Sequence, residues 1–408
     1  MALTPNSLQA KDTPARMHSG NTALSLPQTL VANDTYPIEF SGSGSEYFRI
    51  WVVNLLLILV TLGIYLPWAK VRKLKYFYGN TRIDGDALDF HGEAQKMLRG
   101  SLVAGVFFGV YSTAAAFSPW AGLVAGLAFV AIWPVLYRAS LKFRLHNTSW
   151  RGIRLHLAPS SLSEVYWAVL PPNLLLIVPL ALMGFQDGEM PLQGTSETLW
   201  TGMLVVFGGL FLLSLPYFLW RINRFRVAHS AWGPMRMEFR SDSKDMYIVA
   251  FKTLFMALLL LALFVAAALI LVPGIFVAGK SLGWAGALAI IPLFIIFIVC
   301  MNILPRSYLG AHTQNLVWSR TGNRYMRFKS QLDSLPYMLL QLKNYVLIGI
   351  TLGLYWPFAV VASTRMQIEA ISLRTRIDLN TLTDTARRAD TDAVGDMAAD
   401  MFDMELGI

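Results

Sequence analysis

Residues 54–69 read NLLLILVTLGIYLPWA, and residues 344–359 read NYVLIGITLGLYWPFA. The two stretches align without a gap and keep a set of residues in the same order. The matched positions include Asn54, Thr61, Gly63, Tyr65 and Pro67 in the first copy, and Asn344, Thr351, Gly353, Tyr355 and Pro357 in the second. Such self-similarity predicts an internal duplication. Each copy predicts an apolar helix that ends at a glycine and a proline.

The composition around these stretches is that of a membrane protein. Of the 408 residues, 55% are hydrophobic and 14% are charged, whereas about 25% of an ordinary soluble domain is charged. These values exclude a soluble enzyme and a chain that is disordered throughout. The single cysteine, Cys300, excludes an internal disulfide and a thiolate metal cluster.

Eight apolar stretches are long enough to cross a bilayer, which takes about 20 residues of helix. Only a helix or a closed barrel satisfies its backbone inside lipid. We therefore expect a membrane all-α fold, a polytopic bundle of about eight transmembrane helices. The expected spans are residues 47–66, 97–117, 120–138, 165–184, 199–220, 247–272, 282–304 and 338–358.

Lysine and arginine are concentrated in four loops, which together hold 24 of the 34 cationic residues. These basic loops are residues 68–99, 138–163, 221–246 and 305–343. By the positive-inside rule they face the cytoplasm, which predicts a multi-pass protein of the bacterial inner membrane. The net charge of +9 is then a topology signal and an attraction to anionic lipid headgroups, and we expect no nucleic-acid partner.

Three further prolines, Pro134, Pro216 and Pro305, precede stretches with the same pattern as the one after Pro67. A basic, aromatic stretch comes first and predicts an interfacial helix. Alternating apolar residues follow and predict a short cytoplasmic strand. The expected strands are Ile38–Gly42, Ala87–Gly92, Ile153–Leu157, Met235–Arg240, Tyr325–Lys329 and Arg376–Leu379.

The strands and the spans conflict over the first and last apolar stretches, residues 47–66 and 338–358. If both cross the membrane completely, the N-terminus lies outside, and the first and last strands lie on the opposite side from the other four. If both are re-entrant or interfacial, all strands share one side. We expect complete spans, because a broken helix exposed to lipid is costly.

Several motifs near the N-terminus resemble the YjgN family of bacterial inner-membrane proteins. They read FSGSGSEYFRIWVVN (40–54), TLGIY (61–65), PWAKVR (67–72), YFYGNTRIDG (76–85) and DFHG (89–92). The resemblance extends from about Tyr36 to Arg376. It implies a polytopic inner-membrane protein, and it implies no particular activity.

The chain divides into three parts. Residues 1–35 are rich in Ser, Thr, Asn and Pro and predict a disordered leader without a secretory signal. Residues 36–380 form the membrane domain of repeated helix–proline–basic helix–strand units. Residues 381–408 form an acidic tail that is either disordered or an amphipathic helix over Asp390–Leu406. Because anionic lipid repels such a helix, its expected partner is a protein surface.

Residues that carry catalysis or bind metal are sparse in this sequence. The six histidines form no paired ligand spacing, and His146 with His156 is the least improbable pair. There is no glycine-rich phosphate loop and no nucleophile elbow. We therefore expect no metal, no cofactor and no enzymatic activity.

Three functions remain, in decreasing order of support. The first is a non-catalytic scaffold that binds anionic lipid headgroups, because basic side chains recur beside the predicted spans. The second is a channel or transporter for a small solute or lipid, with Asn54 and Asn344 facing each other across a pseudo-symmetric interface. The third is a membrane enzyme. The expected headgroup ligands are Lys70, Arg72, Lys73, Lys75, Lys142, Arg144, Arg224 and Arg226.

Overall fold

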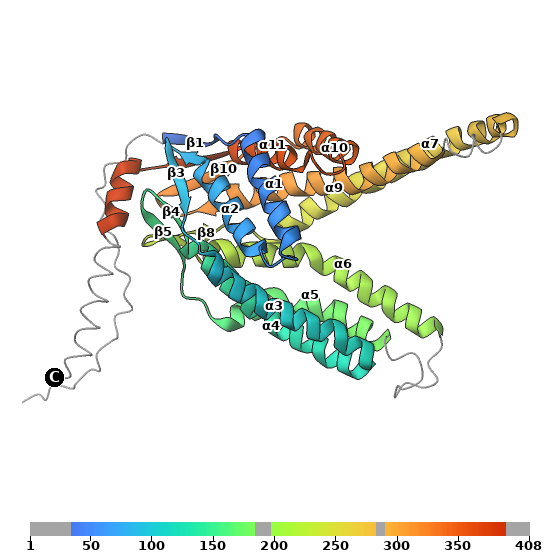
Figure 1. Cartoon of the computed structure of the whole chain (residues 1–408), viewed down its shortest axis with the longest axis horizontal. Coiled ribbons are helices and arrows are strands. Elements are labelled where there is room, and N and C mark those ends of the chain that lie inside the picture. The colour runs from blue at the N-terminus through green and yellow to red at the C-terminus, as the bar shows by residue number, and fades with distance from the viewer. Residues whose placement is uncertain (1–33, 184–196, 283–289, 389–408) are drawn as a thin grey trace, which may run out of the picture.

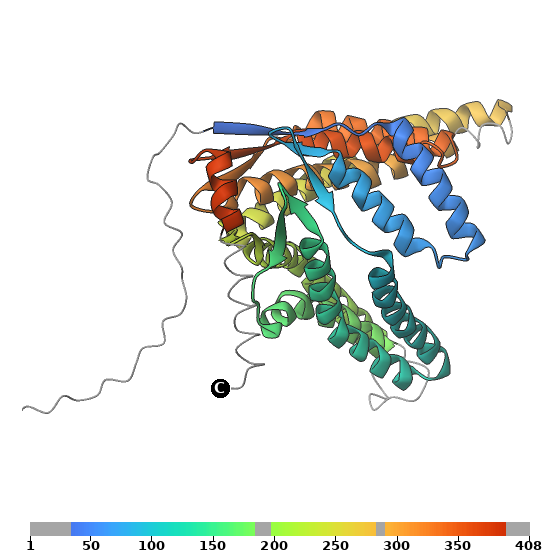
Figure 2. The ribbon, with the colours of Figure 1, turned by 60° about the vertical axis from the view of Figure 1, so that its left-hand side comes forward.

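The computed structural model describes residues 34–183, 197–282 and 290–388 (Figure 1). Short strands gather at one end of the molecule, and long helices project from them in two diverging groups (Figures 1 and 2). All but the last two residues of the expected leader, and residues 390–406 of the tail, lie outside the described ranges.

The helices come in consecutive pairs, each starting and ending beside the strands. Their bounds are α1 Gly44–Val60, α2 Leu66–Gly79, α3 Ala94–Phe117, α4 Pro119–His146, α5 Leu162–Met183, α6 Glu197–Ala228, α7 Ser243–Leu282, α9 Ile290–Ser319, α10 Ser334–Ile350 and α11 Trp356–Glu369. Within each pair the two helices pack against each other. The chain therefore leaves the sheet and returns to it five times.

Eleven short strands form a single antiparallel sheet. Their bounds are β1 Asp34–Phe40, β2 Thr81–Ile83, β3 Asp86–Phe90, β4 Thr148–Trp150, β5 Ile153–Leu157, β6 Ser230–Trp232, β7 Met235–Arg236, β8 Glu238–Phe239, β9 Thr321–Gly322, β10 Met326–Ser330 and β11 Ile371–Thr375. The order is β7-β6-β5-β4-β3-β2-β1-β11-β10-β9-β8. Since β7 and β8 are separated only by Met237, the sheet nearly closes into a barrel.

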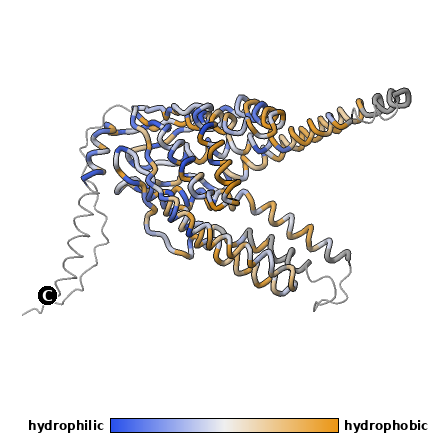
Figure 3. The backbone as a smooth tube through the Cα atoms, in the orientation of Figure 1, coloured by the Kyte–Doolittle hydropathy of each residue, from blue (hydrophilic) through white to orange (hydrophobic). Residues whose placement is uncertain are grey.

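Five helices of the described chain are long and apolar enough to cross a membrane. They are Ala94–Ala114, Trp120–His146, Thr201–Ala228, Ser243–Leu271 and Phe294–Ser319. Figure 3 shows the apolar residues concentrated along the projecting helices and the hydrophilic residues around the strands. The protein is therefore a helical membrane protein with a sheet at one end.

The expectation of complete spans at residues 47–66 and 338–358 needs correction. Helices α1 and α10 have 17 residues each, which is about 25 Å of helix against a hydrocarbon core of about 30 Å. Each then turns back into the next helix. Strand β1 before α1 pairs with β2 after α2, so the chain enters and leaves on one side. Eight spans are therefore not confirmed, and the first and last strands share the sheet with the others.

The prolines Pro134, Pro216 and Pro305 also behave differently from the expectation. Each lies inside one continuous helix, α4, α6 and α9 respectively. Neighbouring helices and local hydrogen bonds allow a proline within a membrane helix. The basic stretches behind these prolines are therefore the last turns of long helices. A separate basic helix follows a proline-containing break only at α2.

Five of the six expected strands fall on observed ones. The interval Ile153–Leu157 coincides with β5, and Met235–Arg240 covers both β7 and β8. The last expected strand, Arg376–Leu379, is wrong. Strand β11 lies earlier, at Ile371–Thr375, and a helix begins at residue 379.

A hydroxyl group marks four junctions where a helix passes into a strand. Thr81, Thr148, Ser230 and Thr321 each donate a side-chain hydrogen bond of 2.6–2.8 Å to the carbonyl four residues earlier. These bonds satisfy carbonyls that the ending helix leaves free. The same helix-to-strand junction therefore recurs at four places in the described chain.

The interior of the sheet is filled with side chains, including Trp150, Trp232 and Met326. The helix of residues 379–388 closes the end of the sheet away from the long helices (Figure 1). Its Leu379, Leu382 and Ala386 belong to the same buried cluster. The expected boundary at residue 380 therefore needs correction, because the described part of the tail, up to residue 388, belongs to the core of the domain.

Gly44, at the start of α1, sits where α1 meets α11. A Cβ at Gly44 would lie 2.5 Å from Cδ1 of Phe358. We expect Gly44→Ala to cost about 1–3 kcal/mol of stability, because the tightly packed ring must move. Gly79→Ala is the matched control, because nothing lies within 4 Å of its Cβ position. Thermal unfolding in detergent, followed by size-exclusion chromatography, compares the two. Equal melting temperatures would contradict this close contact.

Candidate functional site

The turn between α1 and α2, residues 61–65, exposes large apolar side chains. Leu62 is 93% exposed, and Ile64 and Leu66 beside it are also exposed. Leu62 and Gly63 have positive φ values of 49° and 91°, which reverse the chain abruptly. A leucine held out in this way at a tip is unfavourable in water and favourable in lipid.

Every backbone amide from Thr61 to Leu66 has a hydrogen-bond acceptor in the turn or in the end of α1. The Gly63 amide donates to Ile58 O at 2.8 Å, and the Tyr65 amide donates to Thr61 Oγ1 at 3.1 Å. An irregular backbone survives in hydrocarbon only when its polar groups are satisfied internally. The amides of this turn meet that condition, and Thr61 and Gly63 both take part in these hydrogen bonds.

The turn between α10 and α11 has the same geometry. Leu352 is 94% exposed, and Leu352 and Gly353 have φ values of 51° and 93°. The Tyr355 amide donates to Thr351 Oγ1 at 3.0 Å. The remaining amides from Thr351 to Trp356 also have acceptors in the turn or in the end of α10. The described chain thus contains two helical hairpins, α1–α2 and α10–α11, each with an apolar tip whose backbone amides are hydrogen-bonded within the hairpin.

Only the first of these hairpins carries a basic face. On α2, Lys70, Arg72, Lys73 and Lys75 are exposed, and none of them forms an ion pair with a described carboxylate. Arg72 lies over the ring of Tyr65 at 5.9 Å, and Lys73 lies over Phe77 at the same distance. Cations held against rings beside an apolar tip are typical of the layer between lipid and water.

The basic face ends where α1 and α2 are fastened to each other and to the sheet. Tyr47 stacks on Tyr76 at 5.3 Å, and the Tyr76 hydroxyl donates to Ser43 O at 2.7 Å. Burial raises the pKa of Tyr47 to about 12. Arg365 of α11 donates to Gly42 O at 2.7 Å. Arg365 stands eight residues after Pro357, as Lys75 stands eight residues after Pro67. The equivalent cation of the second hairpin thus fixes a loop.

Asn54 and Asn344 are both buried, and each hydrogen-bonds the returning helix of its own hairpin. Asn54 Oδ1 accepts from Arg72 Nη1 at 3.5 Å. Asn344 Nδ2 donates to Ser363 Oγ at 3.2 Å and to Ala359 O at 3.3 Å. These partners assign both asparagines to packing within their hairpins. Asn344 Oδ1 has no hydrogen-bond partner among the described residues.

The remaining expected headgroup ligands lie on two other helices. Lys142 and Arg144 are exposed near the end of α4. Arg224 lies over the ring of Trp220 at 5.1 Å, and Arg226 donates to Asn223 Oδ1 at 2.7 Å. All four are therefore close to the sheet, at the same end of the long helices as α2.

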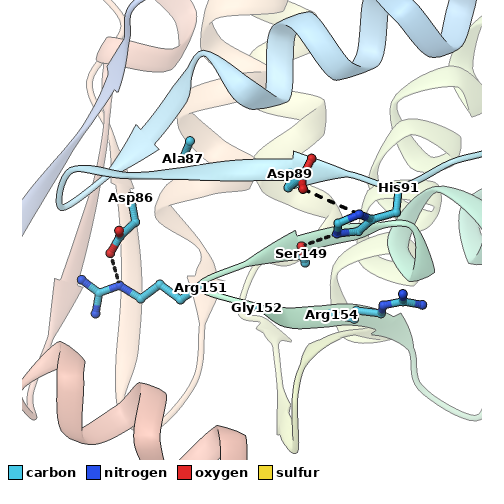
Figure 4. Close-up of a pocket in the computed structure, with 8 residues that line it drawn as sticks. All are labelled: Asp86, Ala87, Asp89, His91, Ser149, Arg151, Gly152 and Arg154. Atoms are coloured by element: carbon cyan, nitrogen blue, oxygen red, sulfur yellow. Dashed lines mark hydrogen bonds and ion pairs between the residues drawn. The ribbon is translucent and has the colours of Figure 1, made fainter.

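The outer face of strands β3, β4 and β5 carries an open pocket of about 440 Å³ (Figure 4). His91 Nε2 and Ser149 Oγ are 2.8 Å apart, and Asp89 Oδ2 is 3.6 Å from His91 Nδ1. The order acid–histidine–serine resembles that of a hydrolase. However, Ser149 is only 4% exposed, so the bond fastens the loop at His91 to β4 and does not present a nucleophile.

Arg151 borders this pocket and binds several groups at once. It donates to Asp86 at 2.6 Å, to Asp84 at 2.7 Å and to Asn380 Oδ1 at 3.0 Å. Its side chain is only 11% exposed. Arg151 therefore joins the β2–β3 turn, the β4–β5 turn and the helix of residues 379–388.

A family model described as "Bacterial protein of unknown function (DUF898)" matches residues 35–401. The chain belongs to this family. Its relatives include the inner membrane protein YjgN of Escherichia coli O157:H7, 27% identical over 204 residues, which are 46% of this chain and 51% of that protein. YjgN of Salmonella typhimurium is 24% identical over 345 residues, 80% of this chain and 85% of that protein.

The chain spans about half the length of the Escherichia coli relatives that it matches. No solved structure matches it. The relatives and the apolar helices together establish a multi-pass inner-membrane protein of the YjgN family. They name no substrate or partner, so the function of this DUF898 chain has to be argued from its own residues.

The sequence interpretation missed Arg151, His91 and Ser149. The pairs Asp84-Gly85 and Arg151-Gly152 were the available signal, because an Asp-Gly pair between short apolar runs predicts a two-residue hairpin turn. The structure gives positive φ to all four residues. Among the described residues, no group of three His, Cys, Asp or Glu side chains is placed to hold a metal, and the pairing of His146 with His156 stays a prediction.

Proposed function

We propose that this protein is a non-catalytic inner-membrane scaffold that binds anionic phospholipid headgroups through hairpin α1–α2. One observation carries the proposal. An apolar tip whose backbone amides are hydrogen-bonded within the hairpin is followed on α2 by four exposed cations that no described carboxylate neutralises. In this arrangement the tip enters the acyl chains and the cations meet the phosphates.

The proposed topology follows from the shared side of all the strands. Pairs α3–α4, α5–α6 and α7–α9 cross the membrane, and pairs α1–α2 and α10–α11 are re-entrant. The matching sequences and turns of the two hairpins support their origin by duplication. Both described ends of the chain then lie with the sheet in the cytoplasm, as the basic loops require.

The distances along α2 support headgroup binding. Lys70 follows the tip residue Leu66 by four positions and Lys75 follows it by nine. These separations correspond to about 6 and 14 Å of helix. The cations therefore reach from the edge of the hydrocarbon into the headgroup layer when the tip is inserted. Each contributes about 1 kcal/mol of attraction to an anionic surface.

Neutralising the four cations tests this proposal. We expect the variant with Lys70, Arg72, Lys73 and Lys75 changed to Gln to lose at least tenfold in its preference for phosphatidylglycerol over phosphatidylcholine. The preference is measured by titrating the full chain in detergent with each short-chain lipid and following tryptophan fluorescence. The Trp68 indole lies on the same helix and reports occupancy.

The control removes the same charge from the outer surface of the sheet. It changes four exposed arginines to Gln, namely Arg82, Arg154, Arg236 and Arg374. We expect the control variant to keep the wild-type preference. An equal loss in both variants would show that net charge alone attracts the lipid, and it would contradict a site on α2.

A transport function is the second candidate, because Asn344 Oδ1 is buried without a hydrogen-bond partner among the described residues, and an unsatisfied buried polar group in a native structure calls for an explanation. Proteoliposomes in a stopped-flow glycerol assay test it. A channel swells faster than empty liposomes, and the double variant Asn54→Leu, Asn344→Leu abolishes the difference at equal protein content. Identical swelling of protein-containing and empty liposomes would speak against a glycerol-conducting pore.

A further inference from the structure

The outer surface of the sheet carries a ring of exposed arginines. Each arginine is adjacent in its strand to a residue of the buried cluster, such as Ile153 beside Arg154 or Leu373 beside Arg374. Since neighbouring residues of a strand point to opposite faces, these arginines point outward. We name them the arginine girdle: Arg82 on β2, Arg154 on β5, Arg236 on β7, Arg327 on β10 and Arg374 on β11.

The girdle is not neutralised by the described part of the chain. None of its five members forms an ion pair or a hydrogen bond with a described side chain. Arg327 and Arg374 stand directly opposite each other in the β10–β11 ladder. Like charges in that position destabilise a sheet. Glu39 stands opposite Arg82 in the β1–β2 register, and it is the one carboxylate that the pairing places across from a girdle arginine.

The sequence after the last described residue has the opposite charge. Residues 389–408 contain no lysine or arginine and six acidic residues, Asp390, Asp392, Asp396, Asp400, Asp403 and Glu405. The described chain stops at Arg388, directly after the helix that closes the sheet. At Gly233, in the β6–β7 turn, a Cβ would lie 3.4 Å from the Cβ of Ala386, so the described chain ends close to the turn that precedes Arg236.

We propose that the acidic segment 389–408 covers the arginine girdle of its own chain. Charge complementarity and proximity both favour this occupant. Twenty extended residues span up to about 66 Å, whereas the way along the sheet from β7 to β10, which passes every other girdle strand, is eight strand spacings, about 38 Å. The segment therefore reaches every girdle arginine from its starting point. Bound there, it blocks the girdle from other polyanions and supplies the protein surface that an acidic helix requires.

Carbodiimide coupling of the full chain in detergent tests the proposal, because it joins a carboxylate to an amine only at contact distance. The variant Arg374→Lys places an amine on the girdle and keeps the charge. We expect coupled peptides between residue 374 and the acidic segment, detected by mass spectrometry. Their yield falls at least fivefold in 0.5 M salt, where the Debye length is about 4 Å.

Lys244, exposed at the start of α7, is the internal control for random coupling, and an equal yield at Lys244 and residue 374 would overturn the proposal. Mixing ¹⁴N- and ¹⁵N-labelled chains identifies the source of the carboxylate. Mixed-isotope products in a one-to-one ratio would mean that the segment binds a second copy, which contradicts binding to its own chain.

A heparin column provides the second measurement. We expect the variant with the six acidic residues changed to Asn or Gln to elute at higher salt than wild type. Adding Arg327→Gln and Arg374→Gln to that variant should abolish most of the shift, whereas adding Lys142→Gln and Arg144→Gln should not. If both additions act equally, the shift reflects net charge. If wild type already binds heparin or RNA through the girdle, the girdle is open and serves a nucleic acid or another polyanion.

Discussion

Replacing Arg151 with methionine is expected to release the helix of residues 379–388 from the sheet. The substitution removes the donor shared by Asp84, Asp86 and Asn380 and leaves two carboxylates facing each other. Breaking a buried pair by removing one partner costs about 3–5 kcal/mol. Because the two carboxylates are partly exposed, we expect about 2–3 kcal/mol here.

Limited proteolysis of the full chain measures this release, with cleavage after Arg387 or Arg388 as the readout. Arg154→Met is the matched control, because Arg154 borders the same pocket (Figure 4) and its side chain makes no hydrogen bond to a described residue. We expect fast cleavage in the Arg151 variant and wild-type rates in the control. Equal protection of both variants would mean that the apolar contacts of Leu382 and Ala386 hold the helix unaided.

Placing a charge at both hairpin tips is expected to stop the hairpins from entering the membrane. In the variant Leu62→Asp, Leu352→Asp, each aspartate costs about 2.5–3.5 kcal/mol at the centre of a bilayer. The cost is smaller near the interface, so the loss reports how deep each tip lies. In water the same change removes an exposed leucine and improves solubility.

Labelling of single cysteines in intact membranes separates these outcomes, with Cys300 replaced by serine. Ile64→Cys is expected to resist a water-soluble maleimide in the otherwise wild-type chain and to react in the aspartate variant. Ala87→Asp, on the exposed outer surface of β3, controls for an added charge. Ready labelling of residue 64 without the aspartates would place the tip in water and would contradict a re-entrant hairpin.

The pattern of apolar residues predicted the long helices and most strands, because both signals are local. Leu, Ile and Phe runs fix a membrane helix, and alternation around Ile153 and Leu155 fixes β5. The repeat of Thr61 and Gly63 at Thr351 and Gly353 marked where α1 and α10 end, but the reversal of the chain at these points was not predicted. These features depend on neighbours in the chain, which a sequence displays.

The features that the sequence did not predict depend on distant partners. Strands β2, β4 and β6 have three residues each, too few to show alternation. Because β1 pairs with β2 and β11, both ends of hairpins α1–α2 and α10–α11 lie at the sheet. The residues around Asn54 carry no local signal of that pairing. Arg151 looked like one cation in a basic loop, because its carboxylate partners lie more than 60 residues away.

The position of β1 between β2 and β11 constrains the order in which the chain matures. Phe40 ends β1 and Ile371 begins β11, 331 residues later. At about 5–20 residues per second, a ribosome needs about 17–66 s to cover that interval. During this time β1 has an unpaired edge, which is a template for aggregation. The exposed edge of the nascent protein therefore needs protection from aggregation until β11 is synthesised. Termination before residue 371 would leave β1 and β10 without their shared partner strand.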